Sequence, residues 1–138
     1  MNGLKFHEIE IGQSASYTKT ITESDVSLFA SISGDANPVH LDEEYAKGSI
    51  FKTRVAHGML TASLISTVLG TQLPGPGSIY AKQDLKFLAP VYFNDTVTAT
   101  CAAKEKIEAR NMIIFDCKVT NQDGVTVLVG DATIVVGK

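Results

Sequence analysis

Hydrophobic positions follow two different periods along the chain. After the break at Pro74-Gly75-Pro76-Gly77, apolar and polar residues alternate in four segments, which is the period of strands with one buried face. Asp123-Gly124 separates the last two segments and is a strong hairpin signal. The second half of the chain therefore predicts four antiparallel strands, over residues 78–88, 96–107, 112–120 and 125–136.

The first half mixes one strand with short helices. Residues 14–21 alternate as a strand does, and Thr22 then offers a hydroxyl cap for a helix that ends at Gly34. Pro38 disfavours the helical conformation at the residue before it, so residues 34–41 are predicted to form an ordered loop. A short capped helix over 42–48 follows.

The segment 55–73 contains no Asp, Glu, Lys or Arg, and its apolar residues lie around most of a helix between Gly58 and Gly70. Such a helix is expected to be buried nearly all round. A curved antiparallel sheet wrapped around one long buried central helix satisfies these elements, so the sequence predicts an α+β fold in a single domain over residues 1–138. The exposed edges of a lone sheet favour pairing of two copies, and hence a homodimer.

Composition narrows the classes of function. The 138 residues carry a formal charge of −3 with no dense run of bases, which argues against a nucleic-acid partner. The N-terminal residues suggest neither a secretory signal nor a spanning helix, so we expect a cytoplasmic protein with no membrane partner. Cys101 and Cys117 are far apart in sequence and lack the close spacing of a zinc or redox motif, so we interpret both as small buried side chains.

The strongest candidate chemistry lies in Ser33-Gly34-Asp35-Ala36-Asn37-Pro38-Val39-His40. On a loop fixed by Pro38, Asp35 and His40 can converge on one water molecule, and a carboxylate with an imidazole suits paired proton transfer. Taken alone, this spacing also fits a structural interpretation, in which Asp35 caps a turn and His40 is a satisfied, half-buried side chain.

A second candidate stands where the apolar helix begins, in Ala56-His57-Gly58-Met59-Leu60. The Gly58 N–H belongs to the unsatisfied first turn and could bind a developing oxyanion. The alternative is that Gly58 only permits tight packing of the helix. His57 is expected to position the start of the helix.

Together these segments resemble the MaoC-like (R)-specific enoyl-CoA hydratases of the hot-dog fold, over nearly the whole chain. The motif of that family is matched by residues 33–40, then by Ala46, Phe51 and residues 56–60, and the later segments 73–80 and 86–91 are similar to those of its short, single-domain members.

The resemblance implies an enzyme that adds water to a trans-2-enoyl-CoA and gives the (R)-3-hydroxyacyl-CoA, with no cofactor and no metal. It implies that Asp35 and His40 are catalytic. We expect Asp35 to take a proton from water and His40 to supply one to the substrate, but the sequence leaves the opposite assignment open. It further implies that the Gly58 N–H binds the thioester carbonyl and that Ser66 supports the dyad; the alternative for Ser66 is a buried serine that bonds only to its own helix. We expect Asn37 to shape the loop and to orient His40.

Two other functions are weighed beside hydration. A hot-dog thioesterase is disfavoured because the predicted central helix carries no acid, and a non-catalytic acyl-CoA binding module would not need a water-activating pair. For substrate binding we name cations that could contact the CoA phosphates and apolar or polar residues that could line the acyl site; these are Lys52, Arg54, Lys82, Lys86, His57, Leu64, Ile65 and Leu69.

Overall fold

The computed structural model describes residues 2–137, so residues 1 and 138, the ends of the predicted domain, lie outside the described residues. The strands are β1 (Ser14–Thr20), β2 (Ile79–Gln83), β3 (Lys86–Phe87), β4 (Thr96–Ile107), β5 (Met112–Thr120) and β6 (Thr126–Val135). The helices are α1 (Glu23–Ser33), α2 (Pro38–Leu41), α3 (Glu43–Lys47) and α4 (Gly58–Thr71), with short 3-10 turns η1 (Phe6–Glu8) and η2 (Glu108–Arg110).

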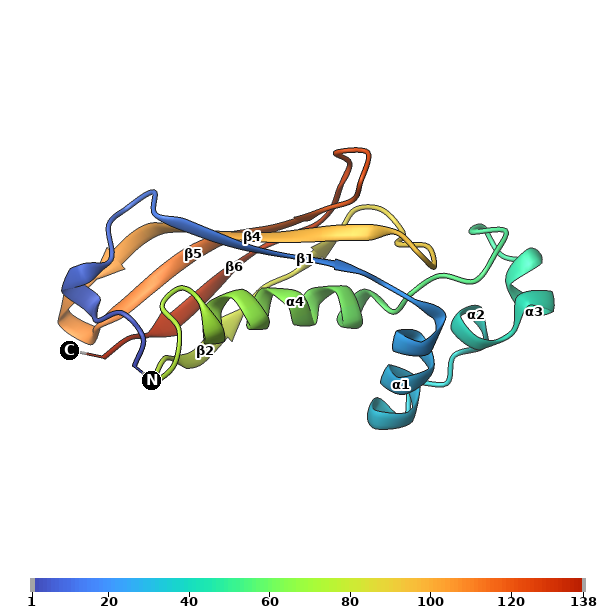
Figure 1. Cartoon of the computed structure of the whole chain (residues 1–138), viewed down its shortest axis with the longest axis horizontal. Helices are drawn as coiled ribbons and strands as arrows, with labels where there is room; N and C mark the ends of the chain where they lie inside the picture. The colour runs from blue at the N-terminus through green and yellow to red at the C-terminus, as the bar shows by residue number, and fades with distance from the viewer. Residues whose placement is uncertain (1, 138) are drawn as a thin grey trace.

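The strands form one antiparallel sheet in the order β1-β4-β5-β6-β2, and β3 also pairs with β6. Residues along β4 and β5 alternate between buried and less buried, so one face of the sheet forms the core. Helix α4 runs along that face and packs against β1, β4 and β5 (Figure 1). The predicted α+β arrangement of a central helix on an antiparallel sheet is confirmed.

Helix α4 is less enclosed than its sequence suggests. Leu64, Ile65, Val68 and Leu69 are buried against the sheet, but the opposite side of the helix, including Met59, is exposed in the single chain. The expectation that the helix is buried nearly all round is therefore wrong for one chain. A helix without charged residues can be buried on every side, but its sequence does not show whether other parts of the same chain cover it. None of the helices that residues 2–137 form is both long and apolar enough to cross a membrane.

Residues 22–57, which we call the overhang, connect β1 to α4 and lie beyond one end of the sheet (Figure 1). Thr22 and Asp25 close a reciprocal capping box on α1, and Gly34 ends that helix with a φ of 78°. The predicted loop over 34–41 is wrong for its second half, where α2 forms. Proline disfavours a helix before itself but suits the first helical position, and the Asn37 side chain caps the turn by accepting from the Val39 N–H.

The predicted strand over 78–88 is interrupted and forms β2 and β3. Gly130 of β6 explains part of the break, because a Cβ on Gly130 would lie 1.9 Å from the Asp84 carbonyl oxygen. The Asp84 N–H bonds to the Asp131 carbonyl at 3.0 Å, and the register against β6 shifts between Tyr80 and Lys82. This close approach of two backbones requires glycine.

Cys101 and Cys117 are buried, as predicted, but they are also direct neighbours. They face each other across β4 and β5 in register, and both are 0% exposed. The contact with Cys101 and burial both raise the pKa of the Cys117 thiol, so this side chain stays protonated at neutral pH. The pair therefore packs as part of the core.

Candidate active site

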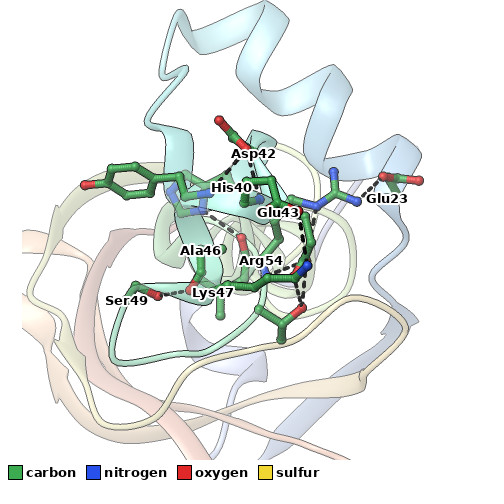
Figure 2. A network of polar contacts seen from close by, with 12 residues as sticks. Glu23, His40, Asp42, Glu43, Ala46, Lys47, Ser49 and Arg54 are labelled. Carbon is green, nitrogen blue, oxygen red and sulfur yellow. Dashed lines mark hydrogen bonds and ion pairs between the residues drawn. The ribbon is translucent and has the colours of Figure 1, made fainter.

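His40 is held in one orientation by the backbone. It lies in α2 with 9% of its surface exposed, and its Nδ1 is 2.7 Å from the Val55 carbonyl oxygen (Figure 2). A carbonyl oxygen only accepts hydrogen bonds, so Nδ1 carries the proton and donates. In the neutral ring, Nε2 is then left with a lone pair.

Burial lowers the pKa of the His40 imidazole. The hydrogen bond to Val55 opposes this shift, the neighbouring His57 adds to it, and the Asp35 carboxylate opposes it. His40 is therefore neutral at physiological pH, with Nε2 as a proton acceptor.

Asp35 is exposed at the end of the loop that follows α1. Its backbone N–H donates to Ser33 Oγ at 3.1 Å, and its carboxylate accepts from the Asn37 N–H at 3.3 Å. One ligand atom from each of Asp35, His40 and His57 lies within 4.8 Å of the other two. A water molecule that forms two hydrogen bonds of about 2.8 Å can span that distance, so the carboxylate and the His40 ring can hold the same water.

His57 connects these two groups and is itself almost fully buried. Its Nε2 donates to the Asp35 carbonyl oxygen at 2.9 Å, and its ring stacks on His40 with centroids 3.8 Å apart and planes at 28°. Phe29 of α1 packs against the His57 ring at a centroid distance of 4.8 Å. His57 thus fixes the loop that carries Asp35 and the ring plane of His40.

Gly58 is the first residue of α4, where the backbone N–H has no intrahelical acceptor and carries the positive end of the helix dipole. A Cβ at this position would lie 2.7 Å from Cε1 of Phe87. Glycine therefore lets the Phe87 ring, and equally a ligand, approach the start of the helix closely.

These groups open into a cavity of about 650 Å³. Asp35, Asn37, His40, His57 and Gly58 are among its lining residues, so the cavity brings together the candidate dyad and the candidate oxyanion donor. The rest of the wall is mainly apolar, and most of its residues are not predicted from the sequence. These residues include Ile50, Met59, Thr61, Phe87, Leu88 and Leu128.

Other residues predicted for the site lie elsewhere. Leu64, Ile65 and Leu69 are packed in the core and line neither this cavity nor a second one of about 480 Å³. Ser66 is exposed on α4 and lines that second cavity, together with Met59 and Tyr80.

The four candidate cations also lie outside the lining of the main cavity. Lys52, Lys82 and Lys86 are exposed. Arg54 forms ion pairs with Glu23 of α1 and Glu43 of α3 (Figure 2). Its guanidinium lies 4.8 Å from the centroid of the Phe93 ring.

Among residues 2–137, the trio of Asp35, His40 and His57 is also the group that could bind a metal ion. Two contacts disfavour this. His57 Nε2 already donates to a carbonyl, and the two rings are stacked with planes at 28°, so their in-plane lone pairs run side by side and do not converge on one ion. The donor set suits a water molecule better.

Comparison with known proteins identifies the family of this chain. The model of the MaoC-like domain matches residues 6–125. An "(R)-specific enoyl-CoA hydratase" of Rhodospirillum rubrum is 52% identical, over 95% of this chain and 90% of the relative. A "3-hydroxybutyryl-CoA dehydratase" of Methylorubrum extorquens is 45% identical, over 98% of this chain and 85% of the relative. The solved structure of an unliganded R-hydratase from Pseudomonas aeruginosa superposes with a TM-score of 0.93 at 44% identity, covering 99% of this chain and 87% of that one. The chain belongs to the MaoC-like domain family.

Proposed function

We propose that this protein is an (R)-specific enoyl-CoA hydratase, a hydro-lyase that reversibly converts a trans-2-enoyl-CoA into the (R)-3-hydroxyacyl-CoA. One observation carries the proposal. The Asp35 carboxylate and a neutral His40 ring lie within reach of one water molecule, in a mainly apolar cavity that also contains the first N–H of α4. The relatives named as hydratases and dehydratases over almost the full length support the same reaction.

The tautomer of His40 suggests how the dyad divides its work. Because Nε2 of the neutral ring has no proton, any proton that His40 delivers must first come from the water. In the proposed step, His40 takes a proton from the water, the water oxygen bonds to the β-carbon, and the same proton returns to the α-carbon on that face. Asp35 accepts the second hydrogen bond of the water and stabilises the imidazolium that forms. This arrangement revises the expectation that Asp35 is the base.

The Gly58 N–H completes the proposed site. Attack at the β-carbon places negative charge on the thioester carbonyl oxygen, and a fixed N–H at the positive end of α4 lowers the energy of that charge. The backbone can offer this donor because residue 58 has no side chain to block the approach.

Replacing either member of the dyad tests the function. We expect Asp35→Asn and His40→Gln each to lower hydratase kcat by about 10² to 10⁴ while the protein stays folded. Asp123→Asn and His7→Gln are matched controls, since both residues are exposed and outside the cavity. Loss of the enoyl absorbance with the native protein, and its retention with the dyad variants, supports hydration. Near-native turnover in both dyad variants would contradict it.

The same assay separates the two alternatives. Release of free CoA identifies a thioesterase, and binding without turnover identifies an acyl-CoA binding module. The structure offers neither alternative a specific advantage, because α4 carries no acid to aim at a thioester carbon and a pure binder needs no water site.

We also propose a cytoplasmic homodimer. Ile79 and Tyr80 on the edge strand β2 are 62% and 41% exposed, and Met59 of α4 is 58% exposed, so an apolar face continues from the sheet edge onto the helix. A second copy would bury this face and pair the edge. Light scattering should give twice the chain mass, and Ile79→Lys should shift the protein toward the monomer.

A further inference from the structure

Two polar atoms beside the proposed dyad are buried without a hydrogen-bond partner. They are Nδ1 of His57 and Oγ1 of Thr61, and both side chains are 2% exposed. Buried polar atoms are almost always satisfied, because leaving one unpaired costs the full desolvation of the group. The pair therefore needs an explanation.

The chemistry of the two atoms is complementary. Since His57 Nε2 donates to the Asp35 carbonyl, Nε2 holds the proton and the neutral ring has a lone pair at Nδ1. Nδ1 thus needs a donor. The Thr61 hydroxyl is a donor, and it lies four residues further on, in the first turn of α4.

Other hydroxyls on α4 behave differently. Ser63 Oγ donates to the Leu60 carbonyl at 2.6 Å, and Thr71 Oγ1 donates to the Thr67 carbonyl at 2.6 Å. Side chains of this type usually bond to the preceding turn in this way. Thr61 is more buried than either and does not, although the His57 carbonyl lies four residues before it.

We propose that Thr61 and His57 form a positioning pair for the dyad. The Thr61 hydroxyl donates to Nδ1 of His57 through one buried water, since the two atoms form no direct hydrogen bond, and so fixes His57 in the tautomer whose Nε2–H holds the Asp35 carbonyl. The ring held in this way also supports the face of His40. The inference rests on the proposed function and assigns a role to two residues that do not themselves exchange protons with the substrate.

The pair also affects the charge state of His40. The ionisable groups that act on His40 are Asp35, from the loop after α1, and His57, from the start of α4. Burial lowers the pKa of His40 most, and the stacked His57 ring lowers it further, whereas the hydrogen bond with Val55 and the Asp35 carboxylate raise it. Removing the His57 ring therefore raises the pKa of His40, and neutral His40 is then lost at a higher pH.

Nitrogen NMR of the imidazoles tests the proposal without any substrate. The chain has three histidines, and His7 is exposed and serves as an internal reference. We expect native His40 to be protonated at Nδ1 and native His57 at Nε2, each as a single tautomer at neutral pH. In Thr61→Val, the His57 signals should shift toward a mixture of tautomers. A native His57 that is protonated at Nδ1, or that already averages two tautomers, would overturn the pair.

Kinetics with matched variants test the consequence. Thr61→Val is expected to lower kcat by about tenfold with little change in KM, the usual effect of one lost hydrogen bond, and Thr61→Ser should restore it. Thr67→Val removes a hydroxyl from the same helix and should leave kcat unchanged. In His57→Gln, kcat should fall by about 10² and the acid limb of kcat/KM should move to higher pH, because Asp35 and His40 lose their common support. If Thr61→Val matches the native protein in both kcat and the His57 tautomer, the pair is wrong, whereas inactive Asp35→Asn would still uphold the dyad.

Discussion

The sheet with α4 and the overhang of residues 22–57 are stabilised by different interactions. The large, fully buried side chains of the sheet and α4 are apolar, and they include Phe115, Ile65 and Leu69. In the overhang, the only two side chains of that class are Val26 and His57. One of the two large, fully buried side chains of the overhang is thus a polar imidazole, whereas those of the sheet and α4 are apolar.

Polar contacts replace hydrophobic packing in the overhang. Figure 2 shows Arg54 between Glu23 of α1 and Glu43 of α3, and the Thr53 hydroxyl donates to Glu43 at 2.8 Å. The His40 contact with Val55 belongs to the same network of contacts. Such contacts are directional and individually weak, so they set the geometry of the proposed dyad while contributing little to global stability. The two regions should therefore respond differently to mutation.

The largest effect on stability is expected in the sheet. Phe115→Ala removes a fully buried ring from β5 and should lower the free energy of unfolding by about 3–5 kcal/mol. Urea denaturation measures this loss. Hydratase kcat per folded molecule should stay near the native value, because the ring does not line the cavity. A fall of kcat in parallel with stability would show that the two regions are not separable.

A smaller effect on stability, with a larger one on activity, is expected in the overhang. Arg54→Met removes two ion pairs and the contact with Phe93, and should lower the free energy of unfolding by about 1 kcal/mol. Because α1 and α3 lose their common partner, kcat should fall by about tenfold. Lys104→Met is the matched control, since it breaks an ion pair with Asp131 within the sheet.

The Michaelis constant decides between two roles for Arg54. If Arg54 contacts the CoA phosphates, as its chain position suggested, KM rises in Arg54→Met and Glu23→Gln leaves KM unchanged. If it positions the overhang, Glu23→Gln reproduces part of the fall in kcat, and KM changes little in either variant.

The same contrast explains what the sequence could predict. Asp35, His40 and Gly58 could be named as candidates from local signals, namely Pro38 in the loop and the start of an uncharged helix. Those signals also fitted a purely structural role, and the resemblance to a family favoured the catalytic one. The strands β4 and β5 were readable from their alternation, since that pattern reports which face is buried. Features that depend on neighbouring residues or on which face is buried can be recognised in the sequence.

Features that depend on distant residues were not predictable. The contact between Cys101 and Cys117 follows from the register of two strands, and the break between β2 and β3 follows from Gly130 on a third strand. The burial of His57 depends on His40 and Phe29, which precede it by 17 and 28 residues and come from two other helices. In each case the feature is determined by a residue that is distant in sequence, so the local sequence around it gives no signal.

The smallest expected effect is the dependence of stability on pH, which should differ between the overhang and the sheet. Burial lowers the pKa of His40 below its ordinary value of 6.5, so between that value and the lowered one the unfolded chain binds a proton that the folded chain does not. Stability should therefore decline gradually as the pH falls below about 6.5, and activity should be lost only lower, where the folded His40 itself becomes protonated. The pKa of Glu43 is also lowered, mainly by its hydrogen bond with Thr53, and the stability that this bond contributes is lost at still more acidic pH.

Hydrogen exchange measured at pH 7 and pH 5 tests this expectation. Backbone amides in residues 22–57 should exchange faster at pH 5 than at pH 7 after correction for the intrinsic rate, and those of β4 and β5 should be unchanged. Equal loosening of both regions would mean that the sheet, and not the polar contacts of the overhang, fixes the position of His40.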